Sequence, residues 1–368
     1  MDFNPTPEQV DVAALARQIL TDRVTVERQR EVEATGVRHD AELFKALGEA
    51  GLVGIALPEA YGGAGLTLLE LTSVITEAGR TVAPLPLAWH GPTALAIAQF
   101  GSTAQKDAWL PGAAAGTVVL TSALSEERSD LPEQPATTAS YDGDSWVLTG
   151  SKALVPAGTV AALFVVSAST DQGVKAFLVK PDDAGVTVEG QKVNDGDQTA
   201  RLELEGVRLD ADRVLVGDDV VGWLSERLTT CLCALQLGIT EGALELTASY
   251  AKEREQFGRP IGTFQAVSQR LADGFIDVLG LRLTTWQAAW RLTEGLPSVV
   301  EVATAKLWAA DTGHKLAHTT VHVHGGVGID LDGAAHRYFT GAKRIELMLG
   351  GTTAQARAIG KVLAAEPA

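Results

Sequence analysis

The sequence has 368 residues, of which 46% are hydrophobic and 21% charged, a composition typical of a globular protein with two or three domains. The formal net charge of −16 makes the average surface repel phosphate backbones and anionic headgroups, so we expect neither nucleic acid nor a membrane surface as a partner. The first nine residues are polar, and no apolar run approaches the roughly 20 residues that cross a bilayer, so we expect no leader or anchor and a cytoplasmic location.

The first third of the chain is predicted to be helical. Its start fits a capping box, because Thr6 can cap a helix, Pro7 suits the first helical position and Gln9 can return the hydrogen bond. Helix-like stretches follow at 40–50 and 66–78. We place an N-terminal helical domain at residues 1–113.

The middle of the chain changes to a period of two, with Gly, Asp and Thr between short runs of β-branched residues. This alternation predicts a β-domain at 114–215. The strand candidates are 146–148, 163–166, 177–179 and 201–205.

The helical period returns after about residue 216 and predicts a C-terminal helical bundle at 216–368. One apolar stripe, spaced by three or four residues, is interpreted as core or subunit interface; it consists of Leu271, Phe275, Leu279, Leu283, Trp286 and Trp290. Helices, then strands, then helices give an α+β fold class.

No metal site is predicted. Cys231 and Cys233 stand two residues apart, so their side chains diverge on a helix or strand, and we interpret both as small buried residues without a disulfide. His314, His318 and His322 share one helix face, but neither a carboxylate nor a cysteine completes a ligand set, and helix-surface histidines are the simpler interpretation.

Three segments in the same order and spacing resemble those of acyl-CoA dehydrogenases. The first is Leu52-Val53-Gly54 with Pro58-Glu59-Ala60-Tyr61-Gly62-Gly63, the second is Arg254-Glu255-Gln256-Phe257-Gly258-Arg259-Pro260-Ile261 with Phe264-Gln265, and the third is His324-Gly325-Gly326-Val327-Gly328-Ile329. The resemblance implies an acyl-CoA dehydrogenase-like architecture whose C-terminal domain is a four-helix bundle, FAD as cofactor, and an oligomer.

The resemblance also implies a site for the ADP part of a neighbouring subunit's FAD. Its residues are Arg254, Gln256, Phe257, Ile261, Gln265, His322, Gly325 and Gly326, with His322 at the place where the family has Gln. The residue types suit this role, because an Arg can pair with a pyrophosphate, a Phe can cover an apolar ring and glycines let a ligand approach the backbone. The simpler alternative for these residues is a surface Arg beside ordinary turns.

The base that removes the α-proton in this family is missing. Its Tyr-Glu-Gly-Thr-like segment is matched here by Leu349-Gly350-Gly351-Thr352, so Gly350 occupies the Glu position. Some members carry the Glu about 26 residues before the motif Arg, which lands on Leu228; Glu226 is two residues away, about 200° around a helix, and Glu241 is more than three turns further along. We therefore assign no catalytic residue and retain Glu226 as the alternative base.

The half-site for the flavin ring is altered as well. The family's Thr-Glu-Pro-x-Ala-Gly-Ser-Asp-like loop is matched by Leu124–Asp130, in which Ser129 and Asp130 persist. Where the family has Lys-x-Trp-Ile-Thr, this chain has Leu154 in place of the Trp and Pro156 in place of the Thr, which also loses a backbone donor.

Losses concentrated on one site beside a retained cross-subunit segment point to a subunit of a heteromeric enzyme. The chain resembles most the β-type subunit of the actinobacterial α₂β₂ acyl-CoA dehydrogenases of steroid side-chain β-oxidation. This resemblance implies a homologous α-type partner that carries the base and binds most of an acyl-CoA substrate, a steroid CoA ester. A self-sufficient homo-oligomer with a displaced base and a non-enzymatic assembly subunit remain the alternatives.

Overall fold

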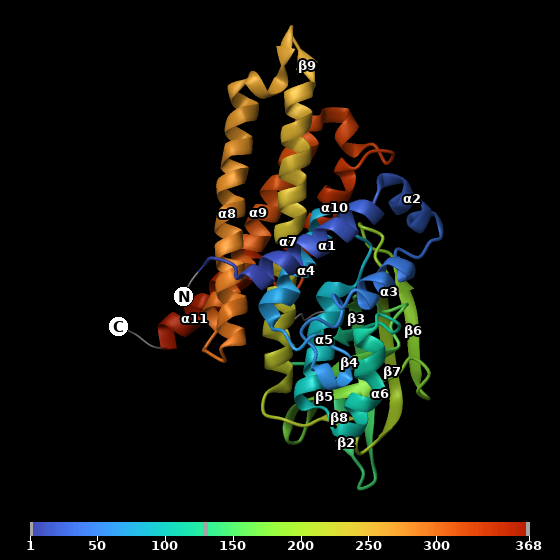
Figure 1. Cartoon of the computed structure of the whole chain (residues 1–368). Coiled ribbons are helices and arrows are strands. Elements are labelled where there is room, and N and C mark those ends of the chain that lie inside the picture. The colour runs from blue at the N-terminus through green and yellow to red at the C-terminus, as the bar shows by residue number, and fades with distance from the viewer. Residues whose placement is uncertain (1–2, 128–131, 366–368) are drawn as a thin grey trace. The chain divides into compact units, whose positions relative to one another are not determined.

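The computed structural model describes residues 3–127 and 132–365 of the chain (Figure 1). These residues form two compact units, each assembled from segments that are distant in sequence. One unit contains the residues up to Arg30, Thr72–Ala83 and those from Thr229 onward, and the other contains Glu31–Leu71 and Pro84–Leu228.

The second unit is built on a β-sheet with the strand order β6-β7-β3-β2-β4-β5-β8, and β1 pairs in parallel with β4. Its strands are β1 (Leu120–Ala123), β2 (Thr138–Tyr141), β3 (Ser145–Val155), β4 (Leu163–Thr170), β5 (Gly173–Val179), β6 (Val186–Gln191), β7 (Thr199–Asp210) and β8 (Val214–Leu215). All four predicted strands are confirmed within β3, β4, β5 and β7. Their inward side chains, including Phe164 and Phe177, form one buried core as the alternation predicts.

Helices complete this unit: α3 (Ala41–Glu49), η1 (Glu59–Tyr61), α5 (Leu87–Phe100) and α6 (Thr103–Ala114). The fully buried His90 links α5 to α6 and β1, because its Nε2 donates to the Ala113 carbonyl at 3.2 Å while its Nδ1 accepts from the Leu120 amide at 3.1 Å. Burial lowers the pKa of His90 to about 4, so the ring is neutral and can serve both partners at physiological pH.

The first unit is helical. Its elements are α1 (Pro7–Arg23), the strands β9 (Glu255–Gln256) and β10 (Arg259–Pro260), η2 (Ile261–Thr263), α8 (Gln265–Thr293), α9 (Val299–His324), η3 (Gly325–Ile329), α10 (Ala335–Leu347) and α11 (Thr352–Ala365). The helices α2 (Val26–Ala34), α4 (Leu68–Arg80) and α7 (Val220–Glu253) contribute residues to both units. Figure 1 shows α7 and α8 as long neighbours joined by the β9–β10 hairpin at one end.

Local signals in the sequence are confirmed in this unit. Thr6 accepts from the Gln9 amide and the Gln9 side chain accepts from the Thr6 amide, which completes the predicted capping box. Cys231 and Cys233 are both buried and unbonded to each other.

Five charged side chains of the helical unit form a network of ion pairs. Arg17 grips the Glu77 carboxylate with two bonds of 2.8 and 2.9 Å, Arg80 bridges Glu77 to Glu241, and Arg282 also binds Glu241. The two carboxylates are buried and the three guanidinium groups surround them. The network therefore connects α1, α4, α7 and α8 through two buried carboxylates that depend on these arginines for their charge compensation.

Glu241→Ala should destabilise the protein by about 3 kcal/mol, because it leaves the partly buried Arg80 guanidinium facing a cavity where its carboxylate stood. The matched control is Glu245→Ala, since this 74% exposed side chain lies 3.9 Å from Arg80 and its pair is screened by water. Denaturant unfolding at one protein concentration measures both variants. Equal stabilities of the two variants would show that the buried network contributes nothing.

Candidate functional site

The segment after α7 is a tight hairpin that carries three of the predicted site residues. Gln256 pairs with Arg259 across it, and the Ile261 amide donates to the Arg254 carbonyl at 2.8 Å. Phe257 and Gly258 turn the chain with φ of 53° and 77°. The sequence folds this way because Gly258 adopts the left-handed conformation without cost and Pro260, which lacks an N–H, ends the pairing.

The tip of this hairpin exposes an apolar ring and a charged group that the described part of the chain neither covers nor pairs. Phe257 is 93% exposed, an unusual position for a large apolar ring. Arg254 is exposed and forms no ion pair with any described residue, although Glu253 and Glu255 flank it in sequence. An unpaired guanidinium and an uncovered aromatic ring within one short hairpin suit a ligand that has both a phosphate and a flat ring.

Ile261 and Gln265 lie just beyond the hairpin. Ile261 begins η2. Gln265 begins α8, and its side chain is exposed. Between them, the Phe264 ring packs edge-on against Phe257, with ring centres 6.2 Å apart. The Arg259 guanidinium lies over the same Phe264 ring, 4.2 Å from its centre. Phe264 thus gives the hairpin a rigid base and leaves Arg254 as its unengaged cation.

The remaining predicted residues lie in the last turn of α9 and directly after it. His322 is exposed in its last turn, and Gly325 leaves the helix with φ of 62° and ψ of −138°, a conformation reserved for glycine. A side-chain carbon added at Gly325 or Gly326 would meet no atom within 4 Å, so the backbone there is open to an approaching group. Both observations fit a loop that lets a ligand contact the backbone.

The ends of α7 and α9 meet through a ring pair that our sequence reasoning missed. Tyr250 of α7 stacks on the buried His324 of α9 with ring centres 4.3 Å apart and planes 22° from parallel. Arg254 follows Tyr250 by four residues, and Gly325 follows His324 directly. The structure therefore brings the hairpin and the glycine loop to the same end of the helical unit (Figure 1).

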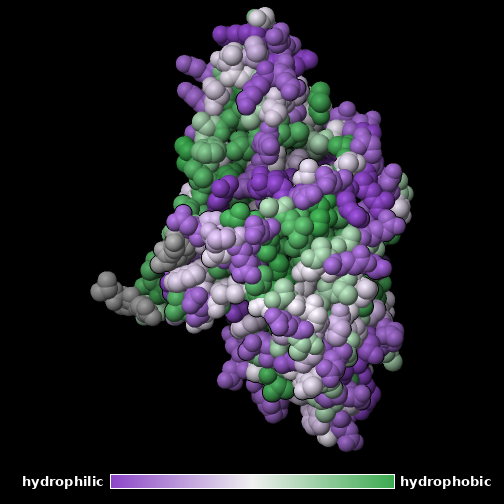
Figure 2. Space-filling view, in the orientation of Figure 1, coloured by the Kyte–Doolittle hydropathy of each residue, from purple (hydrophilic) through white to green (hydrophobic). Residues whose placement is uncertain are grey.

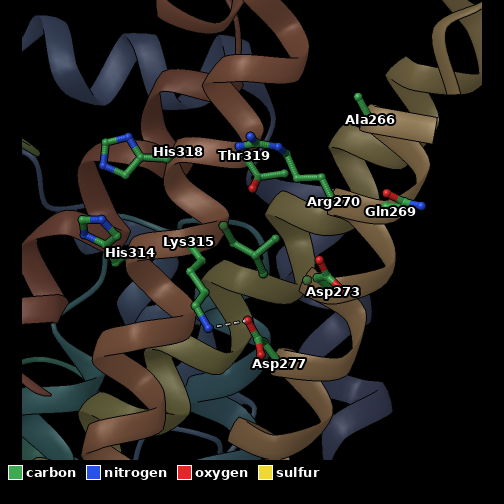
Figure 3. Close-up of a pocket in the computed structure, with 11 residues that line it drawn as sticks. Ala266, Gln269, Arg270, Asp273, Asp277, His314, Lys315, His318 and Thr319 are labelled. Atoms are coloured by element: carbon green, nitrogen blue, oxygen red, sulfur yellow. Dashed lines mark hydrogen bonds and ion pairs between the residues drawn. The ribbon is translucent and has the colours of Figure 1, made fainter. Parts of the chain in front are cut away.

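A groove of about 440 Å³ lies between α8 and α9, one helical turn from Gln265 and His322. In Figure 3 the Arg270 side chain extends from α8 toward Thr319 of α9, and Lys315 is held by Asp277. Among the described residues Arg270 has no ion-pair partner. The groove thus adds a second unengaged cation close to the predicted residues.

Gly350, which the sequence analysis aligned with the family's catalytic Glu, lies in a tight turn between α10 and α11. Leu349 and Gly350 have φ of 51° and 90°, and the Gln355 side chain donates to their carbonyls at 2.8 and 3.2 Å. A side-chain carbon on Gly350 would lie 2.9 Å from Gln355 Nε2 and 3.0 Å from Ala354 Cβ. The turn is adapted to glycine and offers no acidic group.

The alternative carboxylates lie elsewhere on α7. Leu228, the position that a helix-borne base would occupy, is buried, and Glu226 is half-buried about 200° around the helix from it. Glu241 belongs to the ion-pair network with Arg80 and Arg282.

In the β-sheet unit, Glu126 of the loop that matches the family's flavin-binding loop forms an ion pair with Lys152. Lys152, fully buried, donates to Glu126 at 2.8 Å and to Ser167 at 3.1 Å. Burial alone would raise the pKa of Glu126, but bonds from Lys152 and from Thr137 and Ala136 lower it to about 2. Glu126 is therefore ionised and fully engaged in holding β3 to the loop. Ser129 and Asp130 lie outside the described residues.

The strand positions that carry Trp and Thr in the family look different here. Leu154 bulges from β3 with φ of 53° and is 51% exposed, and its amide donates to the Gln191 side chain at 2.8 Å. Pro156 follows the strand, and its carbonyl accepts from Thr121 at 2.7 Å. Neither residue offers a hydroxyl or a large flat surface to a flavin ring.

The three candidate histidines of α9, His314, His318 and His322, are exposed, and the first two have partners. His314 and His318 have ring centres 4.7 Å apart, and His314 Nδ1 lies 3.1 Å from Glu346 and 3.0 Å from Lys343. Within residues 3–127 and 132–365, no three metal-binding side chains converge. Over the same residues no helix is long and apolar enough to cross a membrane.

Family models match almost the whole chain. They are "Acyl-CoA dehydrogenase, N-terminal domain" at residues 6–117, "Acyl-CoA dehydrogenase, middle domain" at 121–207 and "Acyl-CoA dehydrogenase, C-terminal domain" at 224–364. Their order corresponds to the helical, β and helical parts described above.

Similar proteins agree with these matches. Acyl-CoA dehydrogenase FadE27 of Mycobacterium tuberculosis is 44% identical over 377 residues, covering 100% of both chains. The ChsE4–ChsE5 complex from Mycobacterium tuberculosis contains a chain with a TM-score of 0.96 and 44% identity, again over 100% of both chains. A variant of the Tcur3481–Tcur3483 steroid ACAD has a TM-score of 0.93 and 43% identity over 97% of this chain and 98% of that one.

These matches also confirm the predicted cofactor class, since a solved relative at 25% identity is a complex with FADH2. The chain belongs to the acyl-CoA dehydrogenase family, whose members are FAD-dependent oxidoreductases that act on CH–CH bonds.

Proposed function

We propose that this chain is a catalytically incomplete subunit of a heteromeric acyl-CoA dehydrogenase and that it holds the ADP end of its partner's FAD. The proposal rests mainly on a contrast between two places in the C-terminal part of the chain, the turn at Gly350 and the hairpin at Arg254. The base position is a glycine turn closed by Gln355, whereas the Arg254 hairpin is exposed and, among the described residues, no carboxylate pairs with its guanidinium.

The residues divide the work of holding the cofactor's tail. Arg254 would pair with the pyrophosphate, Phe257 would cover the adenine, and the open backbone at Gly325 and Gly326 would accept its edge. Hydrogen bonds from the three remaining polar side chains would fix its orientation; these are Gln256, Gln265 and His322. Ile261 would add apolar contact. FAD, when bound, supplies the acceptor for the hydride that leaves the substrate's β-carbon.

An exposed apolar stripe on α8 supports a subunit partner. Phe275, Leu279 and Leu283 of the predicted stripe are 57%, 39% and 49% exposed, so this part of the stripe is not core. The neighbouring Ile276 is 61% exposed and widens the apolar surface. Figure 2 shows hydrophobic surface along this helix. Such a surface is typical of an interface, and the similar ChsE4–ChsE5 structure is a complex of two different proteins.

For the assembly we propose α₂β₂, with a homologous α-type subunit that supplies the base and binds most of the acyl-CoA. A steroid side-chain CoA ester is the proposed substrate, because the similar Tcur3481–Tcur3483 protein is a steroid ACAD. We also retain the domain boundaries 1–113, 114–215 and 216–368 and a cytoplasmic location as proposals.

Counting cofactors tests the proposal. Co-expressed with its α-type partner, the chain should purify in an assembly with two FAD per four polypeptides, because only the partner's pockets are filled. Purified alone, it should show almost no flavin absorbance. Near-stoichiometric FAD in the chain alone, or four FAD per tetramer, would contradict it and favour a self-sufficient enzyme.

A further inference from the structure

We propose that the Tyr250–His324 ring pair is a positioning device that sets the spacing of the two loops that grip the FAD tail. The inference rests on the proposed function, which assigns those loops to the cofactor. Neither ring is assigned a contact with FAD; both lie on the protein side of the loops, at the last turns of α7 and α9.

The geometry makes the pair stiff. The rings lie 4.3 Å apart and close to parallel, and His324 is only 7% exposed. His324 Nδ1 lies 2.8 Å from the Thr320 carbonyl, which can only accept, so Nδ1 carries the proton and the ring cannot rotate freely. The tyrosine therefore stacks on a ring whose orientation the helix already fixes.

Each ring lies close to a loop along the backbone, Tyr250 through one helical hydrogen bond and His324 through one peptide bond. The Arg254 amide donates to the Tyr250 carbonyl at 2.8 Å, so the first hairpin residue is hydrogen-bonded to the residue that stacks. On the other helix, Gly325 is bonded directly to His324 and breaks the helical conformation at once, with φ of 62°. A change in the distance between the rings should therefore move Arg254 and Gly325 relative to each other.

A second contact between the same helices shows what a purely structural link looks like. Thr247 Oγ1 lies 3.2 Å from Thr320 Oγ1, both buried, one turn further from the loops. This contact holds α7 to α9 but lies farther from Arg254. If the two contacts served helix packing alone, loss of either one would change the affinity for FAD equally. If the ring pair positions the loops, only loss of the ring pair should weaken FAD binding.

The test uses the complex with its partner and measures the FAD dissociation constant by flavin fluorescence. Tyr250→Leu should weaken FAD binding about tenfold, Tyr250→Phe should bind normally because stacking is kept, and Thr247→Val should bind normally even where its melting temperature falls. At saturating FAD, kcat and the substrate KM of Tyr250→Leu should return to the values of the unchanged complex, as a positioning role requires.

His324→Asn provides an independent measurement if Tyr250→Leu does not assemble, since the Asn amide can keep the bond to Thr320 without the ring. It should weaken FAD binding to a similar degree. Normal FAD binding by Tyr250→Leu or by His324→Asn, or equal weakening by Tyr250→Phe, would overturn the inference. The proposed function fails separately, if Arg254→Ala retains FAD.

Discussion

Arg254→Ala should weaken FAD binding by the assembled complex about 10- to 100-fold, the largest effect expected of any substitution in this chain. A charge-assisted bond to a phosphate contributes about 1.5–3 kcal/mol, and Arg254 has no competing carboxylate among the described residues. Equilibrium dialysis of the purified complex against FAD measures the change. Turnover should fall in parallel at limiting FAD and recover at high FAD.

Arg259→Ala is the matched control, because this arginine is on the same hairpin but lies over the Phe264 ring at 4.2 Å. It removes the same charge from the same surface and should leave FAD binding within about twofold of the unchanged complex. Equal losses in the two variants would mean that net charge, and no directed contact, attracts the cofactor. Unchanged binding in Arg254→Ala would favour a subunit that serves assembly alone.

The chain without its partner should turn over acyl-CoA roughly 10⁴-fold more slowly than the complex, even in excess FAD, because general-base catalysis alone contributes up to about that factor. Gly350→Glu should not restore activity: its φ of 90° disfavours a side chain, and Gln355 and Ala354 occupy the space for the new carbon. A dye-coupled dehydrogenase assay on both proteins measures this.

Two further variants keep this prediction sharp. Gly360→Glu, at an α11 position where a side-chain carbon meets no atom within 4 Å, adds the same charge without strain and should be equally inactive. Glu226→Gln removes the alternative base and should change nothing in the complex. Substantial turnover by the single chain that Glu226→Gln abolishes would instead establish a self-sufficient enzyme with a displaced base.

The parts that sequence could predict are those where a few neighbouring residues decide the conformation. The capping box at Thr6 and the alternation in 201–205 concern bonds and faces within one element, and both were found in the structure. The fold class followed from the order of such signals together with the family resemblance.

The parts that sequence could not predict depend on residues brought together by packing. Tyr250 and His324 are 74 positions apart, and neither belongs to a pattern that predicts stacking. The same holds for Glu241, which periodicity places on a helix but which binds Arg80 across 161 positions. The sequence indicates a glycine at position 350 where the family has its Glu, but the closure of this turn by Gln355 depends on how the chain packs.

The projecting β9–β10 hairpin has a genetic consequence. Its tip contacts little of its own polypeptide, so a change at Phe257 should leave this protein folded and abundant. Under the proposed function, the defect would appear as an assembled enzyme that loses its prosthetic group.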